Sequence, residues 1–304
     1  MASVATQKHV AFDIETTEVD LEHVSVSDIT VAATALSDGE RLCWATWLQH
    51  PDYSAPGCPC LEGELRGLLP EDFSSISGGD TKGALATIAA PRLSDAGTVA
   101  LYKYLEDKVA SGYVISTWNG AGFDFQILCA MLKRAGRDDL AERCFQLARG
   151  ASHLDIMFAF FANKGFAVSL GKVAQAMLGG DAAKSMDGRD APLAWLENGR
   201  RQIDVALYCV NDVALQSAIH VAVLTEGRVS WRSRADNLCH WSARSEMKHA
   251  VRLWNAFRRR SKKRARDNDP DPNKPDSVDF YKGDNYASLD EFLSVKASAV
   301  RPLP

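Results

Sequence analysis

Residues 9–15 read HVAFDIE, and this stretch decides the fold. An apolar run is followed by two acids, Asp13 and Glu15, which predicts a buried strand ending in carboxylates. Because side chains alternate across a strand, two residues that are two positions apart lie on the same face. The stretch therefore predicts a core strand that presents both carboxylates on one face.

The segments that follow predict the rest of an α/β domain. Residues 28–36 and 41–48 favour two further strands, joined by the turn SDGE at 37–40, and YVISTW at 113–118 is a fourth. Helical patterns follow a Ser/Asp cap at 94–95 and recur to residue 227, with SHLDIMFAFFANKG (152–165) among them. Three early strands, a helix, a strand and then several helices indicate an α/β layer architecture.

Composition divides the chain into three parts. Residues 1–227 form the expected folded domain, with an insertion of loops and short elements at about 49–93. Residues 228–266 form a basic, tryptophan-containing extension that we expect to be helical. Residues 267–304 form a linker and tail rich in Pro and Asp.

Charge is distributed unevenly along the 304 residues. The net charge is −4, yet residues 228–266 hold thirteen Lys and Arg against two acids, which leaves −15 on the rest. No apolar run approaches the ~18–20 residues that span a bilayer, and no secretory signal is visible. Seven scattered cysteines favour free thiols in a reducing compartment. We expect a cytoplasmic protein without membrane contact, or a nuclear one if RRRSKKRAR (258–266) acts as a localisation signal.

Further acids stand in two other elements. Asp124 opens a helix in NGAGFD (119–124), and Tyr208 and Asp212 share one face of a long helix because they are four residues apart. Asp204, one turn before Tyr208, is interpreted as a surface or capping residue. Hard cations such as Mg²⁺ prefer oxygen ligands, and a pair of them stabilises phosphoryl displacement. Carboxylates that converge without a metal repel one another.

Three motifs in this order carry a family resemblance: FDIET (12–16), NGAGFD (119–124) and YCVND (208–212). Over residues 8–227 the chain resembles the DEDD exonucleases, and the Tyr four residues before the last Asp places the resemblance in the DEDDy branch. The motifs are closest to the proofreading exonuclease domains of family B DNA polymerases and their stand-alone relatives. The resemblance implies an RNase H-like (DnaQ-like) fold, a mixed sheet flanked by helices.

The resemblance also implies roles for individual residues. Asp13, Glu15, Asp124 and Asp212 would hold two divalent metal ions, Mg²⁺ or Mn²⁺, and Tyr208 would orient the attacking water. Thr16 and Asn119 would touch the terminal nucleotide, with Phe123 packed beneath Asp124. Asp155, in SHLDIM (152–157), matches a recurring Asp of the relatives, for which we expect a structural or substrate-positioning role.

The basic extension suggests contact with nucleic acid. Positive grooves with aromatic platforms are typical of proteins that bind single strands. Trp231, Arg232 and Arg234 are therefore candidate substrate contacts. Cys58 and Cys60, within the insertion, lack the second pair that a zinc site needs.

Together these features predict a metal-dependent 3′→5′ exonuclease acting on single-stranded ends, with DNA favoured and nucleoside 5′-monophosphates released. Two alternatives stay open: an exoribonuclease that trims RNA 3′ ends, and a non-catalytic replication or repair accessory protein with the same fold. A DNA polymerase or a repair protein is the candidate protein partner.

Overall fold

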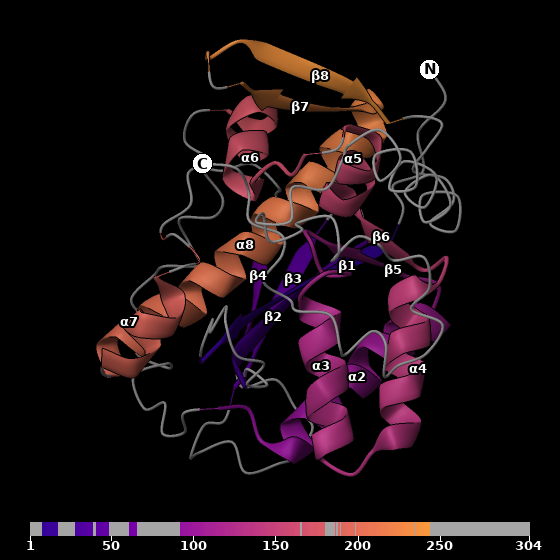
Figure 1. The fold of residues 1–304 in the computed structure, drawn as a ribbon, viewed down its shortest axis with the longest axis vertical. Coiled ribbons are helices and arrows are strands. Elements are labelled where there is room, and N and C mark those ends of the chain that lie inside the picture. Colours follow the sequence, from indigo (N-terminus) through magenta and orange to yellow (C-terminus); the bar gives the residue numbers. More distant parts are fainter. Residues whose placement is uncertain are drawn as a thin grey trace, which may run out of the picture.

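The computed structural model describes residues 8–17, 28–38, 41–48, 61–65, 92–164, 166–179, 186, 188, 190–197, 199–233 and 235–243. Within them, six strands form one mixed sheet in the order β4-β3-β2-β1-β5-β6 (Figure 1). The strands are β1 (His9–Thr16), β2 (Ile29–Ser37), β3 (Leu42–Trp47), β4 (Leu61–Leu65), β5 (Val114–Thr117) and β6 (His153–Asp155). β1 pairs antiparallel with β2 and parallel with β5, so it lies inside the sheet as predicted.

Helices cover both faces of the sheet. One face is packed by α2 (Asp95–Ala110), α3 (Asp124–Arg134) and α4 (Asp138–Arg149). The other is packed by α5 (Ile156–Lys164), α6 (Leu170–Leu178), α7 (Ala191–Glu197) and α8 (Gly199–Glu226). The alternation along β1 follows this division, because Val10, Phe12 and Ile14 lie in the core under α2–α4 and Ala11 lies in the core under α8. The predicted α/β architecture is confirmed, and it is consistent with an RNase H-like fold.

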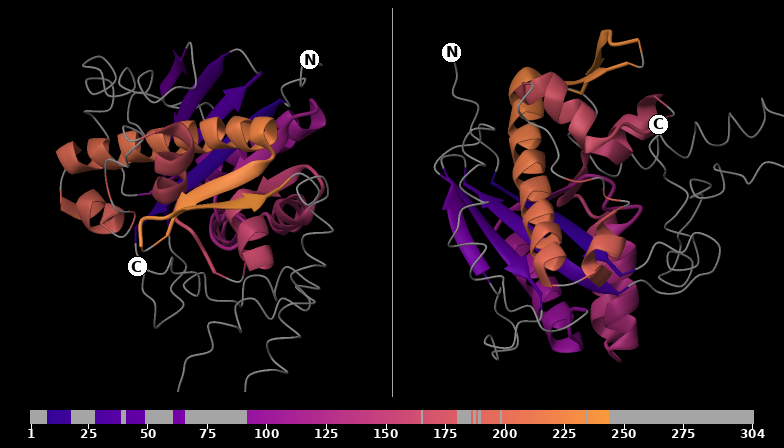
Figure 2. Two further views of the ribbon diagram at one scale, coloured as in Figure 1. Left: turned by 90° about the horizontal axis from the view of Figure 1, so that it is seen from above. Right: turned by 90° about the vertical axis from the view of Figure 1, so that its left-hand side faces the viewer.

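Small side chains allow α8 to lie close against the sheet. Ala11 of β1 and Ala33 and Ala35 of β2 are fully buried in the core beneath it, and Figure 2 shows the helix crossing that face. By length and composition α8 could cross a membrane, but 78% of its most apolar stretch is buried inside the protein. A helix at the core of a folded domain has the same length and composition, so burial and packing account for its apolar character.

Local sequence explains where α2 begins and α4 ends. The Ser94 side chain accepts a hydrogen bond from the Gly97 backbone N–H at 3.1 Å, which caps α2 as the sequence predicts. α4 ends at Gly150, also as predicted. The helix expected over 152–165 was wrong at its start, because residues 153–155 form strand β6 before α5 begins. A strand of three residues is too short to show an alternating pattern of its own.

The start of the basic extension is a hairpin and not a helix. β7 (Arg228–Arg232) pairs antiparallel with β8 (Leu238–Ser242), and the hairpin lies beside α6 (Figures 1 and 2). The rings of Trp231 and Trp241 pack edge-on against Phe160, with centroids 4.8 and 5.7 Å away. This packing gives the hairpin an apolar face to bury, which favours strands over helix. The expected helix beyond residue 243, the tail and most of the insertion at 49–93 lie outside the described residues.

Candidate active site

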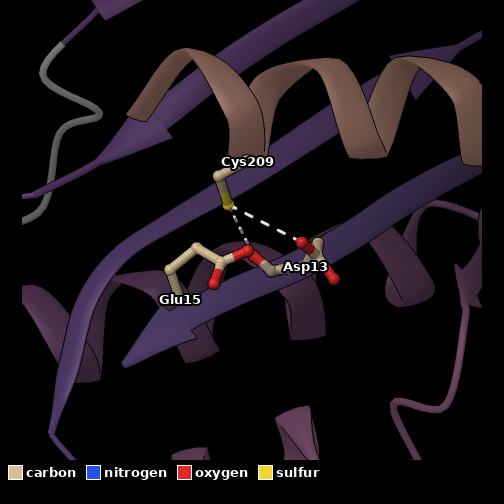
Figure 3. Close-up of side chains that lie close together, drawn as sticks. All are labelled: Asp13, Glu15 and Cys209. Carbon is tan, nitrogen blue, oxygen red and sulfur yellow. Dashed lines mark hydrogen bonds between the residues drawn. The ribbon is translucent and has the colours of Figure 1, made fainter. Parts of the chain in front are cut away.

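The first two acids lie at the end of β1 and face α8. Asp13 and Glu15 lie on the same face of β1 as Ala11, whose side chain is in the core under α8. Figure 3 shows both carboxylates beneath Cys209 of that helix. The Cys209 thiol lies 3.6 Å from the Asp13 backbone oxygen and 3.8 Å from Asp13 Oδ2, as a donor to both. One ligand atom from each of Asp13, Glu15 and Cys209 lies within 4.8 Å of the others.

The third acid is attached directly to the same strand. Asp124 is the first residue of α3, and its Oδ1 accepts a hydrogen bond from the Ile14 backbone N–H at 2.9 Å. β5 pairs with β1 only over His9–Ala11, so Ile14 lies beyond the end of that ladder. The Asp124 carboxylate therefore accepts a hydrogen bond from the β1 backbone at a point where β5 no longer pairs with it. It is only 2% exposed and sits between the positions of Asp13 and Glu15 along β1.

The fourth acid and the tyrosine come from α8. Tyr208 and Asp212 are 2% and 4% exposed, and their side chains are hydrogen-bonded to each other. A Cβ atom added at Gly188 would lie 3.3 Å from the Tyr208 hydroxyl oxygen. The chain at Gly188 therefore passes next to the phenol, and a glycine there leaves room for the hydroxyl.

Electrostatic repulsion shows that the acids converge. Burial raises the pKa of Asp124 well above its ordinary value, and the charge of Asp13 raises it further. Burial also raises the pKa of Cys209, with contributions from all four carboxylates, and that of Tyr208, with contributions from Asp212, Glu15 and Asp13. The four carboxylates therefore lie close together around Cys209 and Tyr208.

The donor set suits hard divalent cations. Oxygen donors come from three elements, β1, α3 and α8, and mutual repulsion is the condition that a bound cation relieves. Asp13, Glu15, Asp124 and Asp212 are the residues able to hold such ions. The Cys209 thiol lies close to the group, but a soft sulfur donor suits Mg²⁺ less well than the carboxylates do.

The remaining predicted contacts fall into two groups. Thr16 is buried at the end of β1, and Asn119 and Phe123 are half-buried in the connection between β5 and α3. Trp231 and Arg232 lie on the β7–β8 hairpin, and their role as substrate contacts stays a prediction. Trp231 is 9% exposed within an aromatic core, and the Arg232 guanidinium pairs with Asp236 Oδ1 at 3.2 Å. Arg234 lies outside the described residues, and Asp204 is half-buried on α8.

Sequence reasoning missed Cys209 as a member of the site. A signal was available, because Cys209 and Asp212 are three residues apart and so share a helix face. A cysteine in an apolar helix is commonly an ordinary core residue, and the free cysteines Cys129 and Cys144 are buried in this way. Helix spacing without the facing strand could not separate these cases.

One family model matches the chain, over residues 79–221, and it describes the RNase H superfamily. The search of curated proteins finds no match. The matched segment carries Asp124, Tyr208 and Asp212, while Asp13 and Glu15 precede it on β1. Residues 79–221 are thus similar to an RNase H-superfamily domain, and strands from the preceding part of the chain complete the sheet. This similarity suggests nucleic-acid processing and the use of divalent metals.

Proposed function

We propose that this protein is a metal-dependent 3′→5′ exonuclease of the DEDDy type. Its substrate is single-stranded nucleic acid, with DNA favoured, and its products are nucleoside 5′-monophosphates. The proposal rests on one observation: Asp13, Glu15, Asp124 and Asp212 converge beside Tyr208 in a domain whose fold is consistent with the RNase H-like class. The order of the three motifs along the chain supports the same assignment.

The chain's own residues divide the work. Asp13 and Glu15 from β1, Asp124 from α3 and Asp212 from α8 would hold two divalent ions. These ions, when bound, supply Lewis-acid stabilisation of the charge that develops on the phosphate. Tyr208 orients the attacking water, and its hydrogen bond to Asp212 fixes the direction of its hydroxyl group. Base specificity is expected to be low, because contacts to phosphate and metal carry little sequence information.

The test is hydrolysis of 5′-labelled single-stranded DNA and RNA of equal sequence, with Mg²⁺, Mn²⁺ or EDTA. We expect a descending ladder with either metal and none in EDTA. Asp13→Ala and Asp212→Ala should abolish the ladder, whereas Tyr208→Phe should slow it by about 10²-fold, the lower end of what proton-transfer and water-positioning groups contribute. Asp204→Asn is the matched control on α8, one turn before Tyr208, and should keep the wild-type rate.

Each alternative has its own outcome. A ladder on RNA alone would replace the DNA substrate with an RNA 3′ end. Binding of single strands without a ladder under any metal would favour the non-catalytic accessory protein. Wild-type turnover by Asp13→Ala would refute the assignment of the site.

A further inference from the structure

The connection between β5 and α3 carries Asn119 and Asp124 through a tight turn. Asn119 adopts a left-handed backbone conformation, with φ at 76°, which costs free energy for any residue with a side chain. Its carbonyl accepts from the Gly122 N–H at 3.0 Å, and the Gly120 carbonyl accepts from the Phe125 N–H at 3.0 Å. A Cβ atom at Gly120 would lie 2.5 Å from the Thr117 side chain, so the turn folds back closely onto the end of β5.

Asp155, at the end of β6, accepts hydrogen bonds from the backbone of this turn. Its Oδ1 accepts from the backbone N–H of Asn119 at 3.0 Å, and its Oδ2 accepts from that of Ala121 at 2.9 Å. Oδ1 also accepts from the Phe158 N–H at 2.8 Å, which caps the start of α5. The carboxylate is 7% exposed, and both of its oxygens are engaged by backbone donors.

His153 shares a face of β6 with Asp155 and secures the preceding residues. Its Nδ1 lies 2.7 Å from the Ala148 carbonyl, which can only accept, so Nδ1 carries the proton. Nε2 is then the acceptor for the Thr117 hydroxyl at 2.7 Å. The His153 ring also packs edge-on against Phe125, with centroids 4.8 Å apart. Strand β6 thus holds the end of β5 and the start of α3 together.

We propose that Asp155 is a positioning residue for Asp124: it fixes the Asn119–Ala121 turn, so that Asp124 reaches the Ile14 N–H beside Asp13. This inference rests on the proposed function and deepens it. We assign Asp155 to the turn rather than to a metal ion, because Oδ1 accepts two backbone hydrogen bonds and Oδ2 accepts one. Its contribution is to set the place of a carboxylate that does bind metal.

Three variants of Asp155 distinguish its hydrogen bonds to the turn from its hydrogen bond that caps α5. Asp155→Ala removes both. Asp155→Ser keeps a good helix cap for Phe158, but its hydroxyl is too short to reach both turn amides. Asp155→Asn keeps the size and one acceptor oxygen, while its NH₂ group faces an N–H donor. The measurements are backbone amide exchange, the Mn²⁺ concentration for half-maximal binding, and kcat and KM on single-stranded DNA.

We expect Asp155→Ser to lose exchange protection at Asn119 and Ala121 but not at Phe158. Its metal affinity and kcat should fall by about 10- to 100-fold, the usual cost of losing a group that orients a ligand. Asp155→Asn should fall between Ser and wild type, and Asp155→Ala should lose protection at all three amides.

Three results would overturn the proposal. One is wild-type exchange and wild-type metal affinity in Asp155→Ser. Another is loss of metal affinity with unchanged protection at Asn119 and Ala121, which would make Asp155 a direct ligand. The third is a loss of kcat that is fully explained by the fraction of unfolded protein. Amide exchange needs no turnover, so it tests the hydrogen bonds to the turn even if the wild-type protein hydrolyses nothing.

Discussion

At the scale of single residues, the carboxylates of the site repel one another in the metal-free protein. Asp124 is buried next to Asp13, and both burial and the neighbouring charge raise its pKa. A carboxyl group whose folded-state pKa is raised contributes its full stability below its ordinary pKa of ~3.9 and loses it as pH rises through the folded value. At neutral pH, which is above the ordinary pKa, the metal-free protein therefore carries a free-energy cost for burying this group beside Asp13, whether the group is ionised or takes up a proton on folding.

Asp124→Asn should stabilise the metal-free protein at pH 7. The amide remains neutral at every pH, and its oxygen can still accept from the Ile14 N–H. We expect a gain of about 1 kcal/mol or more in the free energy of unfolding, which corresponds to a rise in Tm of roughly 2–4 °C. Thermal unfolding in EDTA measures this, with Asp107→Asn on the exposed side of α2 as control. A lower Tm than wild type would contradict the repulsion.

Site residues could be predicted from the sequence where their spacing alone places them on one face of a strand or helix. Asp13, Glu15 and the pair Tyr208 and Asp212 share faces of their own elements, which local periodicity reveals. Other roles depend on a facing element, as that of Cys209 depends on Asp13. To predict them one must know how two segments pack that lie 196 residues apart in the sequence. Trp231 is a further case, because its basic neighbours made it a candidate contact for nucleic acid, whereas the packing of its ring depends on the distant Phe160.

At the scale of elements, a buried polar cluster joins α8 to the sheet. His9 of β1 stacks on His220 of α8 with ring centroids 4.2 Å apart, and His220 Nδ1 lies 3.0 Å from the Ser116 hydroxyl. His9 Nε2 lies 2.6 Å from the Ser217 hydroxyl. These contacts lie along the same helix as Asp212, so they fix the position of α8 along β1 and β5.

This cluster makes stability depend on pH. Burial, and then the neighbouring His9, lower the pKa of His220 well below its usual value. In the unfolded chain it takes up a proton near pH 6.5, so the unfolded state binds more protons as pH falls below that point. Stability from this group is present above about pH 6.5 and is lost as pH falls from there towards the folded pKa. His153, whose pKa burial also lowers, acts in the same direction.

Urea unfolding between pH 7.5 and 5 should therefore show a falling free energy of unfolding. His220→Gln should reduce that slope by up to about 1.4 kcal/mol per pH unit, the value for one proton. His240→Gln, on the exposed side of β8, is the control for the loss of a histidine. An unchanged slope in His220→Gln would mean that His220 is not a source of the acid sensitivity.

Long elements were predicted well because their periodicity is strong. The helices near 94–112 and 201–227 and the strand at 9–15 have the expected places. β6 and the β7–β8 hairpin were not predicted, because three- and five-residue strands show little pattern and draw their stability from Thr117, Phe160 and other distant partners.

At the scale of the whole molecule, we propose that the acidic domain and the basic extension (residues 228–266) both contribute to the binding of substrate. Neutralising Arg258, Arg259 and Arg260 to Gln should weaken binding of single-stranded DNA and flatten its salt dependence, by about 0.7 in slope per lost phosphate contact. The kcat at saturating substrate should persist, because the acids are untouched. Fluorescence anisotropy at several salt concentrations measures this.

A matched triple, Lys103→Gln, Arg137→Gln and Arg143→Gln, removes the same charge from the α2–α4 side of the sheet. It should bind nearly as wild type does. Equal losses in the two triples would mean that net charge alone, rather than the basic extension, governs affinity.

The four acids are far apart along the chain, and this has a consequence for synthesis on the ribosome. Asp212 follows Asp13 by 199 residues, and the contact that brings α8 onto β1 joins residues equally remote. At about 5–20 residues per second, translation reaches the last acid some 10–40 s after the first. A nascent chain whose helix α8 has not yet been synthesised therefore lacks Asp212. It cannot assemble the full set of carboxylates during that time, while it is held by the ribosome near messenger RNA. If the proposed site cleaves nucleic acid, the order of the motifs delays that cleavage until the chain has been made as far as Asp212.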